Sequence, residues 1–270
     1  MSDRLSEMFA RTRAEGRPAV IGFVPAGWPD LDDTVGLVEA AFEGGADAME
    51  IGLPFSDPLG DGVVNQLAYE QAIKNGCTTD TVFAAVAELR ARGVRAPILV
   101  MGYSNPVLAY GMSRFVQAAA SAGVDGFIIV DLPPQEAAEL EVPAREAGLH
   151  MVYLLAPTST EERIRLVAER GSGFIYCVSV VGITGERREL STELPEFIAR
   201  VRAQTDTPLA VGFGISAREH VQSVGTLADA AVVGSAFVRT IAEAAPRERP
   251  AALRALVEEL TGRAPTGARA

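Results

Sequence analysis

The sequence has few of the residues on which several common catalytic chemistries depend. Its 270 residues include two cysteines, Cys77 and Cys177, with no CxxC pair, and two histidines, His150 and His220. These counts exclude a zinc ribbon or a disulfide framework and are too small for a histidine metal cluster. Lys74 is the only lysine, so an enzyme working through a Schiff base would have to use it.

Basic charge and long apolar runs are also scarce. Acidic residues outnumber basic ones 35 to 24, giving a net charge of -11, which argues against nucleic acid or an anionic membrane as a non-specific partner. The longest charge-free run, Ala96–Ser113, is interrupted by Pro97 and Pro106, so no transmembrane span is predicted. Because cysteine is rare and the polar N-terminal segment lacks signal-peptide character, we expect a cytoplasmic protein.

Short apolar runs alternate with amphipathic helical patterns along the chain. Runs of this kind, bounded by Gly, Pro or Asp, are typical of parallel strands covered on both faces. The eight predicted strands are Ala19–Val24, Ala46–Ile51, Pro97–Met101, Gly126–Val130, His150–Leu155, Gly173–Ser179, Pro208–Gly212 and Ala230–Gly234. Eight βα units favour an α/β fold of the (β/α)8 TIM-barrel type over a doubly wound open sheet, which usually has about five or six strands.

The sequence shows no linker or shift in composition, so we expect a single barrel domain over residues 1–260 and a disordered tail over residues 261–270. A helical pattern at Arg4–Arg13 precedes the first strand, and we expect this extra N-terminal helix to plug the bottom of the barrel. The long loop that follows the second strand, Gly52–Gly62, is rich in Pro, Gly and Asp and leads into an additional helix, Val63–Lys74. Loops of this length are usually functional.

Three carboxylates lie at or near this long loop. Reactive groups in a barrel sit at the C-terminal ends of strands, where Glu50 lies between Met49 and Ile51. Glu50 is either a structural acid bonded to nearby groups or an acid/base group with a pKa raised by desolvation, and its position favours the second role. Asp57 and Asp61 are each typical of turns, although converging carboxylates also suit a divalent metal or divided acid and base roles.

Glycine-rich turns follow the last three predicted strands, at Gly182–Gly185, Gly212–Ser216 and Gly234–Ser235. Glycine lets backbone N–H groups approach an anion closely, and a helix N-terminus adds favourable partial charge. One such turn alone would indicate only a tight connection. Three on consecutive strands predict a phosphate site.

Other strand ends carry residues with two interpretations. Tyr103, Tyr176 and Phe213 either pack at the rim of the barrel or wall a flat apolar substrate. Asp131 ends the fourth predicted strand, and its simplest role is to cap the next helix.

Taken together, these motifs resemble the tryptophan synthase α-subunit family. The most specific match is MEIGLPFSDPLGDG at residues 49–62, preceded by Phe23–Gly27. The likeness runs from about residue 2 to about residue 260 in the right order and spacing. The further matching segments are Met101–Val107, Ile128–Pro134, Leu154–Ser159, Ser179–Gly185, Gly212–Ser216 and Val232–Val238.

The resemblance implies a lyase of L-tryptophan biosynthesis that cleaves indole-3-glycerol phosphate to indole and glyceraldehyde 3-phosphate by a retro-aldol reaction. It implies no metal and no cofactor in this chain. By the same resemblance, Glu50 is the catalytic acid/base, Asp61 is the second catalytic carboxylate, and Tyr176 lies near the reacting carbons. The implied substrate-binding residues are Phe23 and Tyr103 for indole, and Gly185, Phe213, Gly214, Gly234 and Ser235 for phosphate.

The residue counts agree with this chemistry. Breaking a carbon–carbon bond requires an acceptor for the electron pair, which many aldolases provide as a lysine imine or a metal. Here Lys74 lies in a helix rather than on a strand, and the sequence has no histidine cluster. An indole ring protonated at C3 is its own electron acceptor, and two carboxylates can then manage the protons.

The resemblance also implies a PLP-dependent β subunit in an α2β2 heterotetramer, with PLP bound only by that partner and indole passed to it through a tunnel. The Pro54–Gly62 loop and residues 104–106 would face it. The stretch after Gly182 resembles a mobile lid, in which Val180 and Val181 replace an arginine-containing pair seen in some members.

Two other functions remain open from the sequence. The first is another phosphate-binding barrel enzyme, such as a sugar-phosphate isomerase, epimerase or lyase, which would explain the glycines but not the whole Glu50–Asp61 segment. The second is a barrel retained mainly as an activating partner subunit, against which the presence of both carboxylates argues.

Overall fold

Nine short strands pair in parallel around a nearly closed barrel in a computed structural model, which describes residues 3–178, 193–212 and 214–262. Their order is β5-β4-β3-β2-β1-β9-β8-β7-β6. The strands are β1 Ala19–Pro25, β2 Ala48–Gly52, β3 Ile98–Gly102, β4 Gly126–Ile129, β5 His150–Val152, β6 Leu154–Leu155, β7 Ile175–Val178, β8 Leu209–Gly212 and β9 Ala230–Val233. The arrangement confirms the α/β barrel and excludes the doubly wound open sheet.

The fifth predicted strand is broken at one residue. Tyr153 separates β5, which pairs with β4, from β6, which pairs with β7. The two ends of the strand order therefore meet at Tyr153. Its hydroxyl leaves the sheet to donate to Glu141 Oε2 at 2.8 Å, so the chain changes pairing partner where this side chain turns outward.

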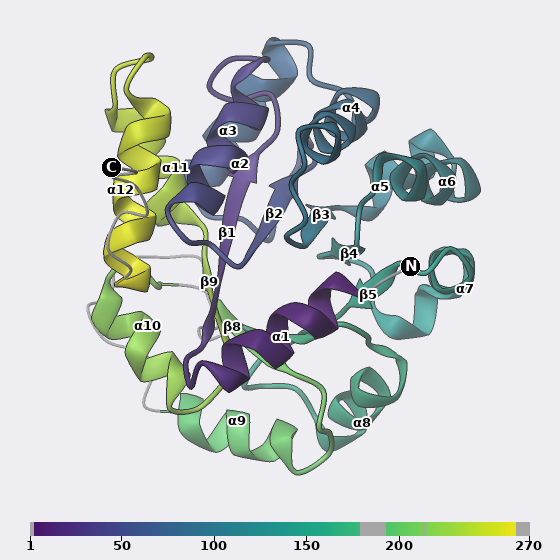
Figure 1. Cartoon of the computed structure of the whole chain (residues 1–270). Coiled ribbons are helices and arrows are strands. Elements are labelled where there is room, and N and C mark those ends of the chain that lie inside the picture. The colour runs from purple at the N-terminus through teal and green to yellow at the C-terminus, as the bar shows by residue number, and fades with distance from the viewer. Residues whose placement is uncertain (1–2, 179–192, 213, 263–270) are drawn as a thin grey trace.

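Helices surround the barrel (Figure 1). They are α1 Arg4–Ala14, α2 Asp33–Glu43, α3 Val63–Lys74, α4 Thr79–Ala91, α5 Ser104–Tyr110, α6 Met112–Ala122, the 3-10 turn η1 Pro134–Glu136, α7 Ala138–Glu146, α8 Glu161–Arg170, α9 Leu194–Arg202, α10 Arg218–Gly225, α11 Ser235–Glu243 and α12 Arg249–Thr261. Local sequence sets their ends: Thr78 begins α4 with a reciprocal capping box, and Gly123 ends α6 at φ +87°.

The last described helix, α12, ends at Thr261, one residue past the predicted domain limit of 260. Residues 263–270 of the predicted tail lie outside the described residues. Among the described helices, none has the length and apolar character needed to cross a membrane.

The barrel interior is a separate apolar cluster closed from below by α1, which lies across one end of the barrel in Figure 1. Phe9 of α1 meets Phe174 edge-on, with ring centroids 6.1 Å apart, and burying such a ring contributes about 2–3 kcal/mol. The predicted plug is therefore confirmed. The cluster consists of Leu5, Met8, Phe9, Ala19, Ile21, Ala48, Leu99, Ile128, Val152, Phe174, Tyr176, Ala210, Ala230 and Val232.

Three aspartates at the N-terminal end of the barrel bind α1 by charge. Asp47, Asp125 and Asp229 directly precede β2, β4 and β9, and we call them the aspartate ring. Each carboxylate accepts a hydrogen bond from a backbone N–H of the neighbouring strand. Each also forms an ion pair with an arginine of α1. The α1 pairs are Arg11 with Asp47 at 2.9 Å, Arg4 with Asp125 at 2.8 Å and Arg13 with Asp229 at 3.5 Å.

Candidate active site

Glu50 faces into the barrel near the C-terminal end of β2. Ala48 belongs to the interior cluster, and side chains two residues apart on a strand share a face. The Glu50 side chain is 1% exposed, and neither carboxyl oxygen has a hydrogen-bond partner among the described residues. Burial, and then the charge of Asp61, raise the pKa of Glu50 to about 8. Glu50 therefore holds a proton at neutral pH and can act as an acid.

Asp61 lies in the loop that leads into α3, and it is buried at 4% exposure. Its Oδ2 accepts from the Tyr103 hydroxyl at 2.6 Å, and its Oδ1 accepts from Asn65 Nδ2 at 3.0 Å. Burial raises the pKa of Asp61, whereas both hydrogen bonds lower it. Two neighbouring carboxyl groups thus differ in environment, because only Asp61 has donors that stabilise a negative charge.

Tyr103 fixes the loop that carries Asp61. Its hydroxyl accepts from the Gly60 backbone N–H at 3.0 Å while it donates to Asp61. A Cβ at Gly60 would lie 2.8 Å from Val130 Cγ1 and 3.1 Å from the Tyr103 hydroxyl, so only glycine fits there. The Tyr103 ring also packs against Phe55, with centroids 5.4 Å apart. The tyrosine is therefore a positioning group for Asp61 as well as a candidate wall of the pocket.

Inward-facing glycines make room for two phenol groups at the mouth of the barrel. A Cβ at Gly212 would lie 2.2 Å from the Tyr176 hydroxyl, and one at Gly52 would lie 2.6 Å from the Tyr69 hydroxyl. Tyr176 belongs to the interior cluster, and the charge of Glu50 is among the causes that raise its pKa, after burial. Tyr176 therefore faces the same space as Glu50.

The first turn of α11 forms one described part of the predicted phosphate site. Ser235 is the first residue of this helix, where backbone N–H groups lack intrahelical acceptors and the helix dipole favours an anion. A Cβ at Gly234 would contact Phe23 at 3.9 Å, so this helix start adjoins the Phe23 ring. Phe23 pairs in register with Glu50 and is buried.

Gly214 follows β8 at φ +80°, a backbone conformation that suits glycine. Gly185 and Phe213, and with them the predicted turn at residues 182–185 and the lid-like stretch, lie outside the described residues. The predicted site residues that the structure does describe lie on the strand ends and on the loops and helix starts that follow them.

Two acids outside the site have structural partners. Asp57 is exposed and accepts from the Ser56 hydroxyl at 2.6 Å, as expected of a turn residue. The simplest interpretation of Asp131, that it caps the next helix, is wrong. Its carboxylate accepts from the Ser104 backbone N–H at 2.7 Å and hydroxyl at 2.8 Å, so it caps α5 in the preceding unit. Residues 104–106 form the first turn of that helix rather than a loop.

Sequence reasoning missed Asn65 and Tyr69, which lie four residues apart on one face of α3. Spacing was the available signal, because Asp61, Asn65 and Tyr69 follow one another at intervals of four. Among the described residues, no group of three or more His, Cys, Asp or Glu side chains could hold a metal ion.

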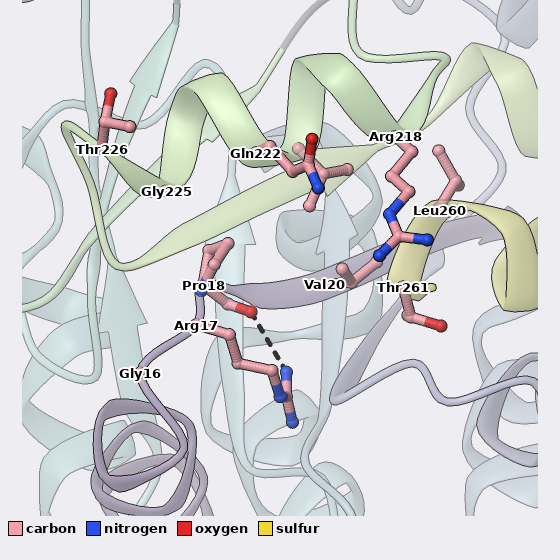
Figure 2. Close-up of a pocket in the computed structure, with 11 residues that line it drawn as sticks. Gly16, Arg17, Pro18, Val20, Arg218, Gln222, Gly225, Thr226, Leu260 and Thr261 are labelled. Carbon is pink, nitrogen blue, oxygen red and sulfur yellow. Dashed lines mark hydrogen bonds between the residues drawn. The ribbon is translucent and has the colours of Figure 1, made fainter. Parts of the chain in front are cut away.

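A cavity of about 380 Å³ lies elsewhere, between the start of β1, α10 and the end of α12 (Figure 2). Arg17 lines it, but this guanidinium is bound to Glu15 at 2.6 Å and Asp47 at 2.7 Å. Arg218 also lines it from α10 (Figure 2). The cavity is at the N-terminal end of β1, the opposite end of the barrel from Asp61 and Ser235.

Comparison with known proteins gives one consistent family. Residues 9–264 match the family model described as tryptophan synthase alpha chain. A tryptophan synthase alpha chain from Roseiflexus castenholzii is 48% identical to this chain, and the match covers 96% of this chain and 99% of the relative. A tryptophan synthase from Saccharomyces cerevisiae is 45% identical over 92% of this chain, which corresponds to 35% of that longer protein.

Solved structures agree. A Mycobacterium tuberculosis tryptophan synthase structure is 37% identical, covers 99% of this chain and 100% of that chain, and has a TM-score of 0.89. A tryptophan synthase alpha chain from Legionella pneumophila is 32% identical, covers 97% of each chain and has a TM-score of 0.88.

Proposed function

Because the chain belongs to the tryptophan synthase alpha chain family, we propose that Glu50 and Asp61 carry out its reaction, with Tyr176 beside the reacting carbons. The alpha-chain reaction is that of a lyase, which cleaves indole-3-glycerol phosphate to indole and glyceraldehyde 3-phosphate. One observation carries the assignment of roles. Within the described part of the chain, Glu50 is buried without donors, whereas Asp61 is buried with two.

Glu50 begins the reaction as the acid. It donates its proton to C3 of the indole ring, which leaves a cationic ring and an ionised Glu50. That carboxylate then takes the proton of the hydroxyl on C3′, the side-chain carbon attached to the ring. The O–H electron pair forms the aldehyde, the C3–C3′ bond breaks, and its electron pair returns to the ring. Glu50 ends protonated, so the cycle closes, and an acid/base group of this kind contributes about 10²–10⁴ in rate.

Asp61 stabilises the charge that develops in the ring. The donors Tyr103 and Asn65 favour its ionised form, and an ionised carboxylate can accept a hydrogen bond from the ring N–H. Burial raises the pKa of Asp61 overall, and the two donors limit that rise. An Asp61 that is ionised when the substrate binds places a negative charge beside the ring before the ring becomes cationic, which lowers the barrier without reorganising the site.

The remaining side chains orient the substrate. Phe23 and Tyr103 flank the inward-facing acids and wall the indole ring. The start of α11 at Gly234 and Ser235, together with Gly214, Gly185 and Phe213, binds the phosphate. Binding energy from the phosphate, which is remote from the broken bond, then holds C3 against Glu50. The ring accepts the electron pair, so this chain needs neither a metal nor a cofactor.

A β subunit is the proposed partner, in an α2β2 heterotetramer in the cytoplasm, with PLP bound by that subunit alone. Leu59 is 81% exposed beside Asp61, and Val63 and Leu67 are 67% and 61% exposed one helical turn apart on α3. Large apolar side chains gathered on one surface favour a protein partner. The same loop and helix carry Asp61 and Asn65, so a subunit bound there would act directly on the catalytic loop.

The Glu50→Gln variant tests the assignment. Purified protein is given indole-3-glycerol phosphate, with and without a β subunit, and indole release is measured. We expect a fall of at least about 10²-fold in kcat, because the amide N–H protons are too weakly acidic to be transferred to C3. Glu70→Gln is the matched control, since Glu70 is an exposed residue of α3 paired with Lys74. Substantial turnover by folded Glu50→Gln protein would refute the role of Glu50.

A further inference from the structure

Tyr69 has a buried hydroxyl with no hydrogen-bond partner among the described residues. Its side chain is 0% exposed and lies on α3, and its ring meets Phe23 edge-on with centroids 6.3 Å apart. Burying a hydroxyl without a hydrogen-bond partner destabilises the folded state. This cost calls for an explanation at a site where a second polar group, the carboxyl of Glu50, is also buried without a partner among the described residues.

The Tyr69 hydroxyl and the Glu50 carboxyl lie on the same face of β2. The hydroxyl occupies the space in front of Gly52, where a Cβ would be 2.6 Å away. Gly52 and Glu50 are two residues apart on β2 and share its inward face, so their Cα atoms are about 7 Å apart. The charge of Glu50 is among the causes that raise the pKa of the Tyr69 hydroxyl, after burial and the charges of Asp61 and Tyr103. Phe23, which packs against Tyr69, also pairs in register with Glu50.

Glu50 needs a donor during the reaction proposed above. Once it has given its proton to C3, its carboxylate is a buried charge, which is costly without a hydrogen bond. We propose that Tyr69 is a positioning residue that donates its hydroxyl hydrogen to the Glu50 carboxylate whenever that carboxylate is ionised. The inference rests on the proposed function for its catalytic consequence but not for the hydrogen bond itself.

Other ionisable groups face the same space. Asp61 approaches Glu50 from the loop after β2, and its charge disfavours a second negative charge there. Tyr176 approaches from β7, and the charges of both acids act on it. Tyr103 lies beyond Asp61, and its hydroxyl hydrogen is engaged by that aspartate. Burial, and then the charges of Asp61, Tyr103 and Glu50, raise the pKa of Tyr69. Among the phenols that the structure describes, Tyr69 is the one whose hydroxyl is fully buried and has no partner there.

A substrate-free titration tests the hydrogen bond directly. Infrared difference spectra between each protein and its Glu50→Gln counterpart report the protonated Glu50 carboxyl as a function of pH. Losing a donor to the charged form raises the pKa of Glu50. We expect Tyr69→Phe to move the titration midpoint upward by about one pH unit. Tyr110→Phe is the control, because the Tyr110 hydroxyl is bonded to exposed Asp80 outside the site.

Kinetics supply the second readout. In Tyr69→Phe, kcat for indole release should fall roughly tenfold, the lower end of what a hydrogen bond to a charged group contributes, with KM nearly unchanged. The alkaline limb of kcat should move to higher pH, because the acid form of Glu50 persists longer. The melting temperature should equal or exceed that of the wild type, since the variant removes an unpaired buried hydroxyl.

An unshifted Glu50 midpoint in folded Tyr69→Phe protein would overturn the inference, as would a shift seen in Tyr176→Phe but not in Tyr69→Phe. If the wild type releases no indole, the proposed function fails, whereas the infrared titration still decides whether Tyr69 and Glu50 interact.

Discussion

At the N-terminal end of the barrel, Asp47 is fully buried and accepts hydrogen bonds from Arg11, Arg17 and the Val20 backbone. At the C-terminal end, Glu50 is equally buried and has no partner among the described residues. Asp47 directly precedes β2, and Glu50 lies within the same strand, towards its C-terminal end. Their different surroundings show that burial alone does not define a role, because the partners decide whether the charge is stable or the proton is mobile.

The difference follows from where the arginines lie. Those of α1 and the neighbouring segments reach the strand starts and pair with the aspartate ring. At the mouth of the barrel, the groups around Glu50 are instead phenols and another carboxylate. Arginine always carries its charge, so it would hold Glu50 ionised. Phenols leave it protonated and still offer a donor when it ionises.

The largest expected effect concerns stability against pH in Glu50→Gln. Below about pH 4.5, Glu50 is protonated in both the folded and the unfolded chain. Between that pH and about 8 only the folded chain keeps the proton, so wild-type stability falls relative to the variant as pH rises. Above about pH 8 the stability difference between the two proteins stops changing, having moved by about 5 kcal/mol in favour of the variant relative to its value below pH 4.5. Urea unfolding of both proteins at pH 5 and pH 9 measures it.

A surface carboxylate supplies the control for that experiment. The same pair of unfolding curves for Glu70→Gln, on the surface of α3, should run parallel to the wild type at both pH values. If Glu50→Gln also runs parallel, then Glu50 is not a protonated buried acid, and the contrast between the two ends of the barrel disappears.

Asp47→Ala should have the next largest effect, of opposite sign. Removing this carboxylate deprives Arg17, which is 22% exposed, of one of its two carboxylate partners and leaves the Val20 N–H without its side-chain acceptor. We expect a loss of about 3 kcal/mol in the free energy of unfolding. Because the site is at the other end of β2, kcat/KM per folded molecule should not change. Chemical unfolding and indole release, measured on one preparation, check both.

Glu43→Ala is a suitable control for Asp47→Ala. Glu43 is 62% exposed in its pair with Arg254, and an exposed pair of this kind contributes about 0–1 kcal/mol. A large loss of turnover in folded Asp47→Ala protein would show that the N-terminal end also shapes the site, contrary to the separation argued here.

The sequence allowed the barrel to be predicted and singled out Glu50, because both depend on local patterns, and the catalytic role of Glu50 stays a prediction. Eight apolar runs define the strands, and Glu50 is conspicuous between apolar neighbours. The break at Tyr153 could not be predicted, since periodicity reports which face a residue takes and not which strand it pairs with. Asp131 was misassigned for a related reason. Its partner Ser104 is 27 residues away, and short-range capping rules do not reach that far.

Tyr69 could not be identified from the sequence, because its proposed role depends on a hydroxyl that has no hydrogen-bond partner among the described residues. A tyrosine beside Ala68 on an amphipathic helix is typical of core packing, and it is indeed fully buried. The missing partner of its hydroxyl, and the glycine at position 52 that makes room for it, are visible only in three dimensions. Tyr103 differs, because its strand-end position pointed to the site even before its bond to Asp61 was known.

Tyr103→Phe should give the smallest of these effects, and it tests whether the hydrogen bond from Tyr103 lowers the pKa of Asp61. The variant removes a donor to Asp61, which raises the pKa of Asp61 further. The acidic limb of the kcat profile should therefore move to higher pH, and kcat should fall by roughly tenfold or less. Tyr153→Phe is matched to it, because it deletes a phenol-to-carboxylate bond to Glu141 away from the site. If both variants leave the pH profile unchanged and lose only stability, then Tyr103, like Tyr153, has a purely structural role. The donors that distinguish Asp61 from Glu50 would then not determine the charge of Asp61.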